Sequence, residues 1–197
     1  MSTASVTKLV FQCNNIGKES TLLLTFDSDM PGMYEDYFPV VWNMVDLTYR
    51  FALIKPQVQN GRIVDATTAV EINVSGSHLL CDSWYQCKQS HAGLPGALKA
   101  INDTGERQEI AVGTTNLGGL IPEPALFFPK FENASNITAQ FTPKLRAYIT
   151  PAYQEDDILR AAIHTPPIWE RDLTALNQST TWNITWDPSG RYAITEA

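Results

Sequence analysis

The chain has 197 residues, 44% of them hydrophobic and 18% charged, which is typical of a globular protein and predicts a single domain over residues 1–197. The formal net charge of −7 argues against a nucleic-acid-binding protein and against docking on an anionic membrane surface, because no basic stripe is present to contact phosphates. No apolar stretch approaches the roughly 18 residues of a membrane-spanning helix, so we expect a soluble protein with neither nucleic acid nor membrane as a partner.

Turn residues recur about every 8–12 residues, with short β-branched and aromatic segments between them, which is typical of an all-β sandwich or barrel. The predicted strands are Val6–Phe11, Thr21–Phe26, Val40–Val45, Leu47–Ile54, Gln57–Val64, Thr68–Val74, His78–Tyr85, Glu109–Thr114, Ala125–Phe131, Asn136–Phe141, Leu145–Thr150, Thr181–Trp186 and Arg191–Thr195. We expect an all-β fold, an antiparallel sandwich or barrel with one or two short helices.

Three hairpins are predicted from their turn residues. Asn60-Gly61 lies between two predicted strands, and both residues tolerate the positive φ angles of a type I′ turn. In Asp187–Gly190, Pro188 presets φ for a type I turn and Gly190 suits the left-handed position that follows. A third hairpin is predicted over Glu71–Leu80, around a Ser-Gly-Ser turn.

Alternation of side chains assigns the faces of two predicted strands. In Leu47–Ile54 we expect one buried face, made by Leu47, Tyr49, Phe51 and Leu53. The opposite face consists of Thr48, Arg50 and Ala52. Near the C-terminus, one face is shared by Trp182, Ile184 and Trp186.

Helix signals are few. Leu94–Asn102 is a candidate short helix because Pro95 would lie in its first turn. Glu155–Ile163 begins with acidic residues, which suit a helix N-terminus, although a strand is the alternative there. Asp172–Leu176 predicts one further helical turn.

The motifs of several enzyme classes are absent. The chain has no G-x-S-x-G serine motif, and Gly113–Gly119 lacks the lysine of a phosphate-binding P-loop, so we interpret it as a flexible loop. No catalytic residues are therefore assigned, and we expect a protein that is not an enzyme. An isomerase or cyclase built on a β scaffold is the alternative, because catalytic groups on such scaffolds can lie far apart in sequence.

Two groups of residues have the chemistry of metal ligands. His78, Cys81, Cys87 and His91 suit zinc by type, but their spacing is wider than that of structural zinc sites. Asp27, Asp29 and Glu35 offer the oxygen ligands of a calcium site, and we interpret their segment as a solvated connection. We expect no metal. The odd number of cysteines predicts unlinked thiols, with a Cys81–Cys87 disulfide as the alternative.

The N-terminal segment MSTASVTKLVFQ has no apolar core of a secretory signal peptide, which predicts a cytoplasmic protein, with unconventional secretion as the alternative. Glycosylation sequons nevertheless occur at Asn73, Asn102, Asn133, Asn136, Asn177 and Asn183. Because Asn- and Thr-rich β proteins accumulate such triplets, we interpret them as structural rather than as glycosylation sites.

Aromatic residues are the strongest candidates for ligand contacts, because small-molecule pockets are mostly apolar with a few orienting polar groups. We assign stacking surfaces to Trp42, Trp84, Tyr85 and Trp169, and a polar anchor to Arg50. The alternatives are that these rings fill the core, or that they form a platform for sugars.

The C-terminal third contains Ile168–Leu173, Thr180–Asp187 and Arg191–Thr195. These stretches resemble small, leaderless, β-rich proteins of basidiomycete fruiting bodies, a group that includes the pink chromoproteins of oyster mushrooms. The resemblance implies a β-rich protein that holds a small organic chromophore, but it assigns no binding residue. We expect a binding protein for a small, largely apolar organic ligand, with a pigment as one form of it. The alternative is a carbohydrate-binding lectin.

Overall fold

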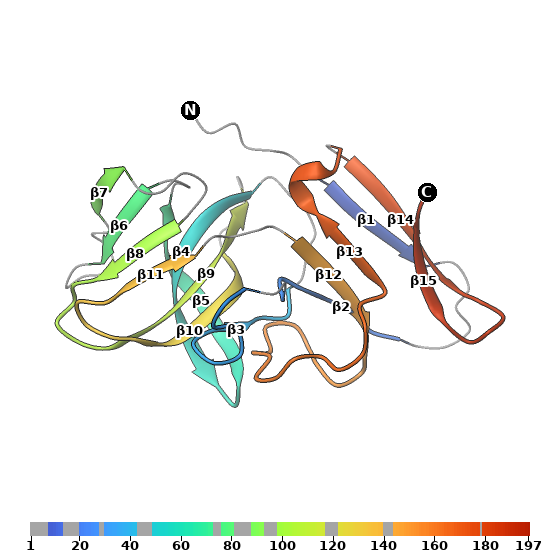
Figure 1. Cartoon of the computed structure of the whole chain (residues 1–197), viewed down its shortest axis with the longest axis horizontal. Helices are drawn as coiled ribbons and strands as arrows, with labels where there is room; N and C mark the ends of the chain where they lie inside the picture. The colour runs from blue at the N-terminus through green and yellow to red at the C-terminus, as the bar shows by residue number, and fades with distance from the viewer. Residues whose placement is uncertain are drawn as a thin grey trace.

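The computed structural model describes residues 8–13, 20–27, 30–42, 49–72, 76–80, 88–92, 98–116, 122–139, 144–177 and 179–197 (Figure 1). These residues form 15 strands and one turn of 3-10 helix, η1 (Leu173–Ala175). The strands are β1 (Lys8–Cys13), β2 (Leu22–Thr25), β3 (Phe38–Pro39), β4 (Tyr49–Gln59), β5 (Arg62–Ile72), β6 (Gly76–Leu80), β7 (Lys88–Ala92), β8 (Leu98–Asn102), β9 (Gln108–Asn116), β10 (Glu123–Phe131), β11 (Asn136–Ala139), β12 (Lys144–Ile149), β13 (Trp169–Asp172), β14 (Ser179–Trp186) and β15 (Tyr192–Glu196).

The described strands make four sheets, and the predicted all-β fold is confirmed. The orders are β3-β10-β9-β4-β5, β11-β8-β6-β7, β13-β12-β2 and β1-β14-β15. Most neighbours are antiparallel, whereas β1 with β14 and β6 with β8 are parallel. Within this described part no sheet closes into a barrel.

The five-stranded sheet is buried on both faces. Leu53 of β4 packs on one face with Ala100 of β8, so the four-stranded sheet covers that side. Ala52 and Ile54 pack on the other face with Ile158. The expectation that the Ala52 face is open was therefore wrong: Ala52 is 1% exposed, because β4 lies between β5 and β9 and is covered from both sides.

The two three-stranded sheets enclose a separate core that is rich in tryptophan. Trp169 of β13 packs edge-on against Trp182 of β14, with ring centroids 5.1 Å apart. Phe11 of β1 meets the same Trp169 ring at 5.4 Å. On the predicted shared face of β14, Trp182 and Ile184 are buried and Trp186 at the strand end is 39% exposed.

Two of the three predicted hairpins are confirmed. Asn60 and Gly61 have φ angles of 52° and 78° and join β4 to β5, as a type I′ turn requires. Gly190 has φ 81° between β14 and β15. The third hairpin was wrong, because β5 and β6 belong to different sheets. Residues 73–75 of that turn lie outside the described residues.

Both longer helix predictions were wrong. Residues 98–102 form β8, which pairs with β6 and β11, while residues 94–97 lie outside the described part. Residues 155–163 form turns and isolated bridges instead of a helix. Ile158 and its neighbour Leu159 point into different core clusters, which an extended chain permits. The single turn predicted near Leu176 is η1.

The predicted loop Gly113–Gly119 begins inside β9, which runs to Asn116. Gly113 is needed there for close backbone approach, since an added Cβ would lie 2.1 Å from the Glu123 carbonyl oxygen. Residues 117–119 lie outside the described residues. Among the described residues, no helix has the length and apolar character needed to cross a membrane.

Candidate functional site

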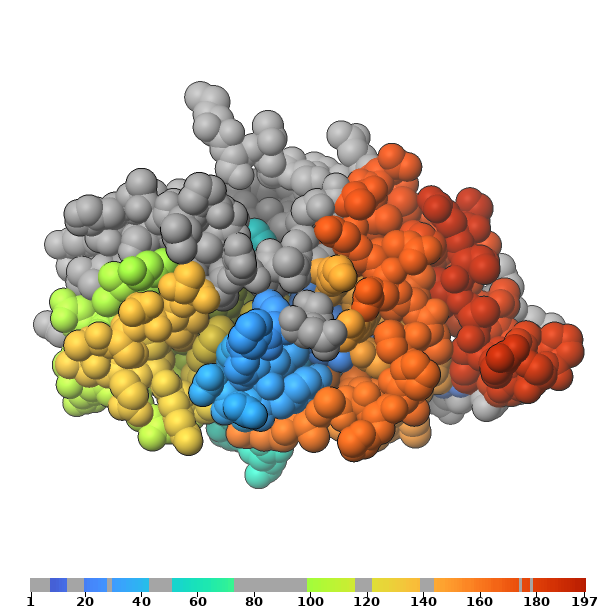
Figure 2. Space-filling view, in the orientation of Figure 1, coloured from blue at the N-terminus to red at the C-terminus, as the bar shows by residue number. Residues whose placement is uncertain are grey.

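A cavity of about 710 Å³ lies between β10, β11 and the turn at residues 30–37. Figure 2 shows this turn, in blue, beside the yellow residues of β10 and β11 on the visible face. The lining residues are Met30, Pro31, Glu35, Asp36, Tyr37, Leu126, Phe128, Lys130, Phe131, Glu132, Ser135, Asn136, Ile137 and Thr138. The volume falls within the range of about 300–1,000 Å³ that is usual for small-molecule pockets.

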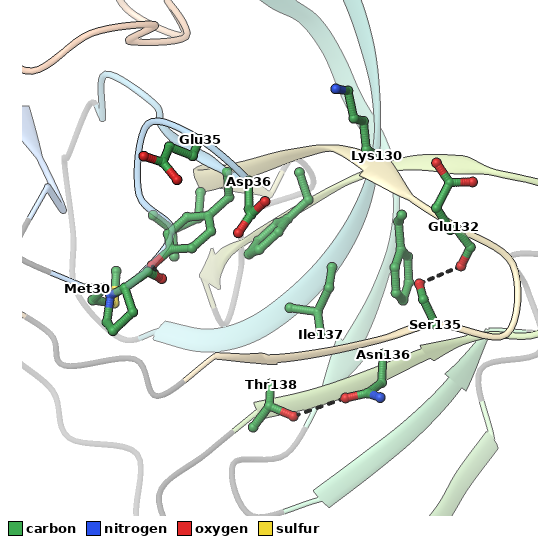
Figure 3. A pocket seen from close by; sticks show the side chains of 14 residues that line it. Met30, Glu35, Asp36, Lys130, Glu132, Ser135, Asn136, Ile137 and Thr138 are labelled. Atoms are coloured by element: carbon green, nitrogen blue, oxygen red, sulfur yellow. Dashed lines mark hydrogen bonds between the residues drawn. The ribbon is translucent and has the colours of Figure 1, made fainter.

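The floor of the cavity is aromatic. Tyr37 stacks on Phe128 with ring centroids 5.0 Å apart and an interplanar angle of 27°. Phe131 and Phe128 are buried, so they form the base, whereas Tyr37 and Ile137 are half-buried and line the accessible part. In Figure 3, Ile137 points from β11 into the cavity, and its neighbours Asn136 and Thr138 lie on the other side of the strand.

The turn at residues 30–37 is held by a set of backbone hydrogen bonds. The Gly32 carbonyl oxygen accepts from the N–H groups of Glu35 and Asp36 at 3.2 and 2.8 Å. Gly32 has φ 86°, and a Cβ there would lie 2.8 Å from Asp36 Oδ2. Tyr34 also has a positive φ of 67°, unusual for a tyrosine, and its ring packs beside Tyr148. One turn thus supplies both a cavity wall and an anchor.

The anchor is a buried polar cluster around Asp27. The Tyr148 hydroxyl donates to Asp27 Oδ2 at 2.7 Å, and Arg146 Nη1 donates to the Asp27 carbonyl oxygen at 2.9 Å. Burial and the nearby Asp27 carboxylate raise the pKa of Tyr34, which therefore stays protonated at neutral pH. The interpretation of the Asp27 segment as solvated was wrong at Asp27, which is 6% exposed.

Asn102 fixes the connection between β10 and β11. Its side-chain Nδ2 donates to the carbonyl oxygens of Phe131 and Glu106 at 2.7 and 2.8 Å. Its Oδ1 accepts from the backbone N–H and hydroxyl of Thr104 at 3.1 and 2.7 Å. Asn102 is 0% exposed, so this sequon is a structural turn. The hydrogen bonds determine where the Phe131 end of the cavity lies.

Acidic side chains gather around a second cavity of about 470 Å³. Burial, followed by repulsion from Glu155 and Asp156, raises the pKa of Glu123 to about 7. Burial and the Glu155 carboxylate raise the pKa of Asp156 to about 6. Asp65 borders the same space, whereas Arg62 is held by Asp157 at 2.9 Å. The main consequence of this crowding is pH-dependent stability.

The structure places two of the predicted ligand residues, Trp42 and Trp169, outside the lining of the 710 Å³ cavity. Trp42 and Trp169 are 3% and 4% exposed and belong to the tryptophan-rich core. Their indole N–H groups have no hydrogen-bond partner among the described residues. The backbone of Arg50 lies in β4 opposite Thr115, and its side chain lies outside the described part. Trp84 and Tyr85 also lie outside the described residues.

The predicted metal ligands are not brought together in the described part. His78 and His91 lie on the paired strands β6 and β7, and Cys81 and Cys87 lie outside the described residues. Within the described ranges, no three His, Cys, Asp or Glu side chains are arranged to hold a metal ion. Asp29 is likewise outside those ranges. Cys13 is an exposed free thiol.

Sequence reasoning missed Tyr37, Phe128 and Ile137 as site residues. Phe128 and Ile137 belong to strands that the sequence did predict, and Tyr37 lies in the acidic segment that we interpreted as a connection. Comparison of the chain with protein-family models, curated proteins and solved structures finds no match. The functional argument therefore depends on the geometry of the cavity.

Proposed function

We propose that this protein binds a small, largely apolar organic molecule in the cavity between β10, β11 and the turn at residues 30–37. A pigment is one form of such a ligand, as the resemblance to fruiting-body chromoproteins implies. The proposed role is non-enzymatic binding. Trp42 and Trp169, which were predicted to contact the ligand, pack in the core instead. The ligand contacts that we now propose are made by the aromatic lining of the cavity.

The observation that carries this proposal is the combination of volume and lining. A space of about 710 Å³ is bordered by the stacked pair Tyr37 and Phe128 and by the inward-pointing Ile137. Polar side chains also line the cavity and can orient a ligand on the apolar floor. The walls are also anchored, since Asn102 holds the Phe131 end and Tyr34 holds the turn.

Replacement of Ile137 by tryptophan is expected to weaken binding of a neutral apolar dye, Nile red, about tenfold, or about 1.4 kcal/mol. The indole would occupy the space between β11 and the aromatic floor. Nile red fluorescence, which increases in apolar surroundings, measures the dissociation constant. Native mass spectrometry of protein from its source tests for a bound organic molecule directly.

The matched control is Ile194→Trp, because Ile194 is also a half-buried isoleucine on an edge strand but packs against the tryptophan-rich core. We expect the control to bind Nile red as the wild type does. Equal binding by the wild type and the Ile137→Trp variant would show that the dye does not occupy this cavity and would contradict the proposal.

A carbohydrate-binding function is the second candidate, because Trp186 is 39% exposed on the β14–β15 hairpin. Its ring meets that of the half-buried Tyr192 with centroids 4.6 Å apart, and an exposed indole supported in this way can stack on a sugar ring. A lectin would bind to a glycan array, and Trp186→Ala would remove that binding. Retention of Nile red binding by the same variant would separate the two functions.

A further inference from the structure

The charged side chains that line the 710 Å³ cavity point in different directions. In Figure 3 the Asp36 carboxylate reaches from the turn toward Ile137, into the space that a ligand would occupy. The Lys130 amino group and the Glu132 carboxylate extend from the far end of β10, away from Ile137. Glu35 lies on the outer side of the turn. The inward-facing charge of the described lining is therefore negative.

Asp36 also differs from Glu132, the acidic lining residue that follows β10, in its ion-pair partners. Glu132 lies 3.8 Å from Arg107, which partly compensates its charge. The Asp36 carboxylate has no hydrogen bond or ion pair to any residue in the described part of the chain. The turn holds the backbone of Asp36, because its N–H donates to the Gly32 carbonyl oxygen, and the residue itself is exposed. An uncompensated carboxylate at a cavity wall favours a cationic partner.

The aromatic floor adds to this preference. A cation placed over the face of a tyrosine or phenylalanine ring is attracted by the ring quadrupole. The half-buried Tyr37 follows Asp36 in the sequence, and one face of its ring stacks on Phe128. Burial and the Asp36 charge together raise the pKa of Tyr37, so the negative potential of Asp36 extends over this ring. A positive group here would interact with both the carboxylate and the ring.

We propose that the preferred occupant of this cavity is an organic cation with a flat apolar body. Its ammonium group pairs with Asp36, and its body packs beside Tyr37, Phe128 and Ile137. An anionic ligand of the same shape would meet the Asp36 carboxylate at short range and is disfavoured. This inference rests on the proposed function, since it names the chemical class of ligand for the same cavity.

The test uses three probes that share a naphthalene body and differ in charge. They are 1-naphthylmethylamine, 1-naphthalenemethanol and 1-naphthoic acid, titrated against the full chain at pH 7 by ligand-observed NMR. We expect the amine to bind about five- to tenfold more tightly than the alcohol, and the acid to bind most weakly. Added salt should reduce the difference between amine and alcohol, because exposed charges are screened.

Asp36→Asn keeps the shape of the side chain and removes its charge. In this variant we expect the advantage of the amine over the alcohol to fall to about twofold, the part that the Tyr37 ring supplies, with the alcohol affinity unchanged from the wild type. The control is Glu196→Gln, which removes an exposed charge on β15, outside the cavity, and should keep the preference for the amine.

The outcomes separate this inference from the proposed function. Equal binding of amine and alcohol by the wild type would overturn the cationic preference, as would a preference of undiminished size in Asp36→Asn. In both cases loss of alcohol binding in Ile137→Trp would still support the cavity as a binding site. Failure of every probe to bind, or binding unaffected by Ile137→Trp, would overturn both proposals.

Discussion

Replacement of Asn102 by alanine is expected to lower the free energy of unfolding by about 2–4 kcal/mol. The side chain is fully buried and makes four hydrogen bonds, two as donor and two as acceptor. Alanine would leave the Phe131 carbonyl oxygen without this donor in a closed environment and would release the turn at Thr104. Urea unfolding of both proteins at pH 7 measures the difference.

Two further variants make the Asn102 prediction specific. Asn177→Ala removes an exposed asparagine that also begins a sequon, and we expect a change within about 0.5 kcal/mol. Asn102→Asp places a carboxylate against two carbonyl oxygens, and it should be at least as destabilising as alanine at pH 7. If Asn102→Ala and Asn177→Ala unfold with the same free energy, the assigned role of the Asn102 hydrogen bonds is wrong.

The same position explains why a sequon can be structural. The Thr104 hydroxyl, which completes the Asn102 triplet, donates to the asparagine itself and closes the turn after β8. At the triplet of Asn136, the Thr138 hydroxyl lies 3.4 Å from the Asn136 Oδ1 atom on β11. Asn-x-Thr spacing therefore arises here from turn and strand chemistry that requires no glycan.

The two hairpin turns could be predicted from the sequence, because the backbone conformation of a tight turn depends mainly on the residues within the turn itself. Asn60-Gly61 needs positive φ at both positions, and few other residue pairs supply it. The Asp187 Oδ1 atom accepts from the Arg191 N–H at 2.9 Å, which closes the C-terminal hairpin from within five residues. Such features need no knowledge of the rest of the chain.

The strand segments were also predictable, but their neighbours were not. Sheet order depends on contacts between distant segments, as when β1 near the N-terminus pairs with β14. Leu98–Asn102 has residues that suit a short helix, and its strand conformation follows from pairing with β6 and β11. Tertiary packing decided between two local options that differ little in free energy.

The cavity could not be predicted because its walls are distant in sequence. The turn at residues 30–37 meets β10 through long-range packing, in which Met30, Met33 and Tyr37 contact the cluster that contains Phe128. Tryptophan content suggested a ligand pocket at Trp42 and Trp169, whereas these rings mainly fill the space between two sheets. Large aromatic side chains serve both purposes, and sequence alone does not separate them.

Stability is expected to fall as the pH rises from about 4 to 7, because the acids of the second cavity are forced to ionise in the folded state. The pKa of Glu123 is raised to about 7 and that of Asp156 to about 6, above the values of about 4 in an unfolded chain. Between these values the folded protein binds more protons than the unfolded chain, so the free energy of unfolding decreases with pH. We expect a loss of about 2–4 kcal/mol from the two groups together.

The acid side of the profile has a different origin. Arg146 donates to Glu170 at 2.5 Å, and this contact lowers the pKa of that carboxyl. A lowered pKa contributes stability that is present above the unfolded value and lost as the pH falls below it. Greatest stability is therefore expected at about pH 4, because Glu123 and Asp156 lower the stability above it and the contribution of Glu170 is lost below it. Urea unfolding from pH 3 to 9 measures the complete profile.

Glu123→Gln isolates the contribution of the second cavity. Glutamine resembles the protonated carboxyl, so we expect the variant to exceed the wild type by about 1–2 kcal/mol at pH 8 and to match it near pH 4. The control is Glu109→Gln, which removes the charge of an exposed acid on β9 and should change the stability little at either end of the pH range.

The groups that face Glu123 are all acidic. They are Glu155 and Asp156 on the turn and Asp65 on β5, and the nearby Arg62 is already paired with Asp157. A Glu123→Gln variant with the wild-type profile would show that these carboxyl groups do not share a desolvated space.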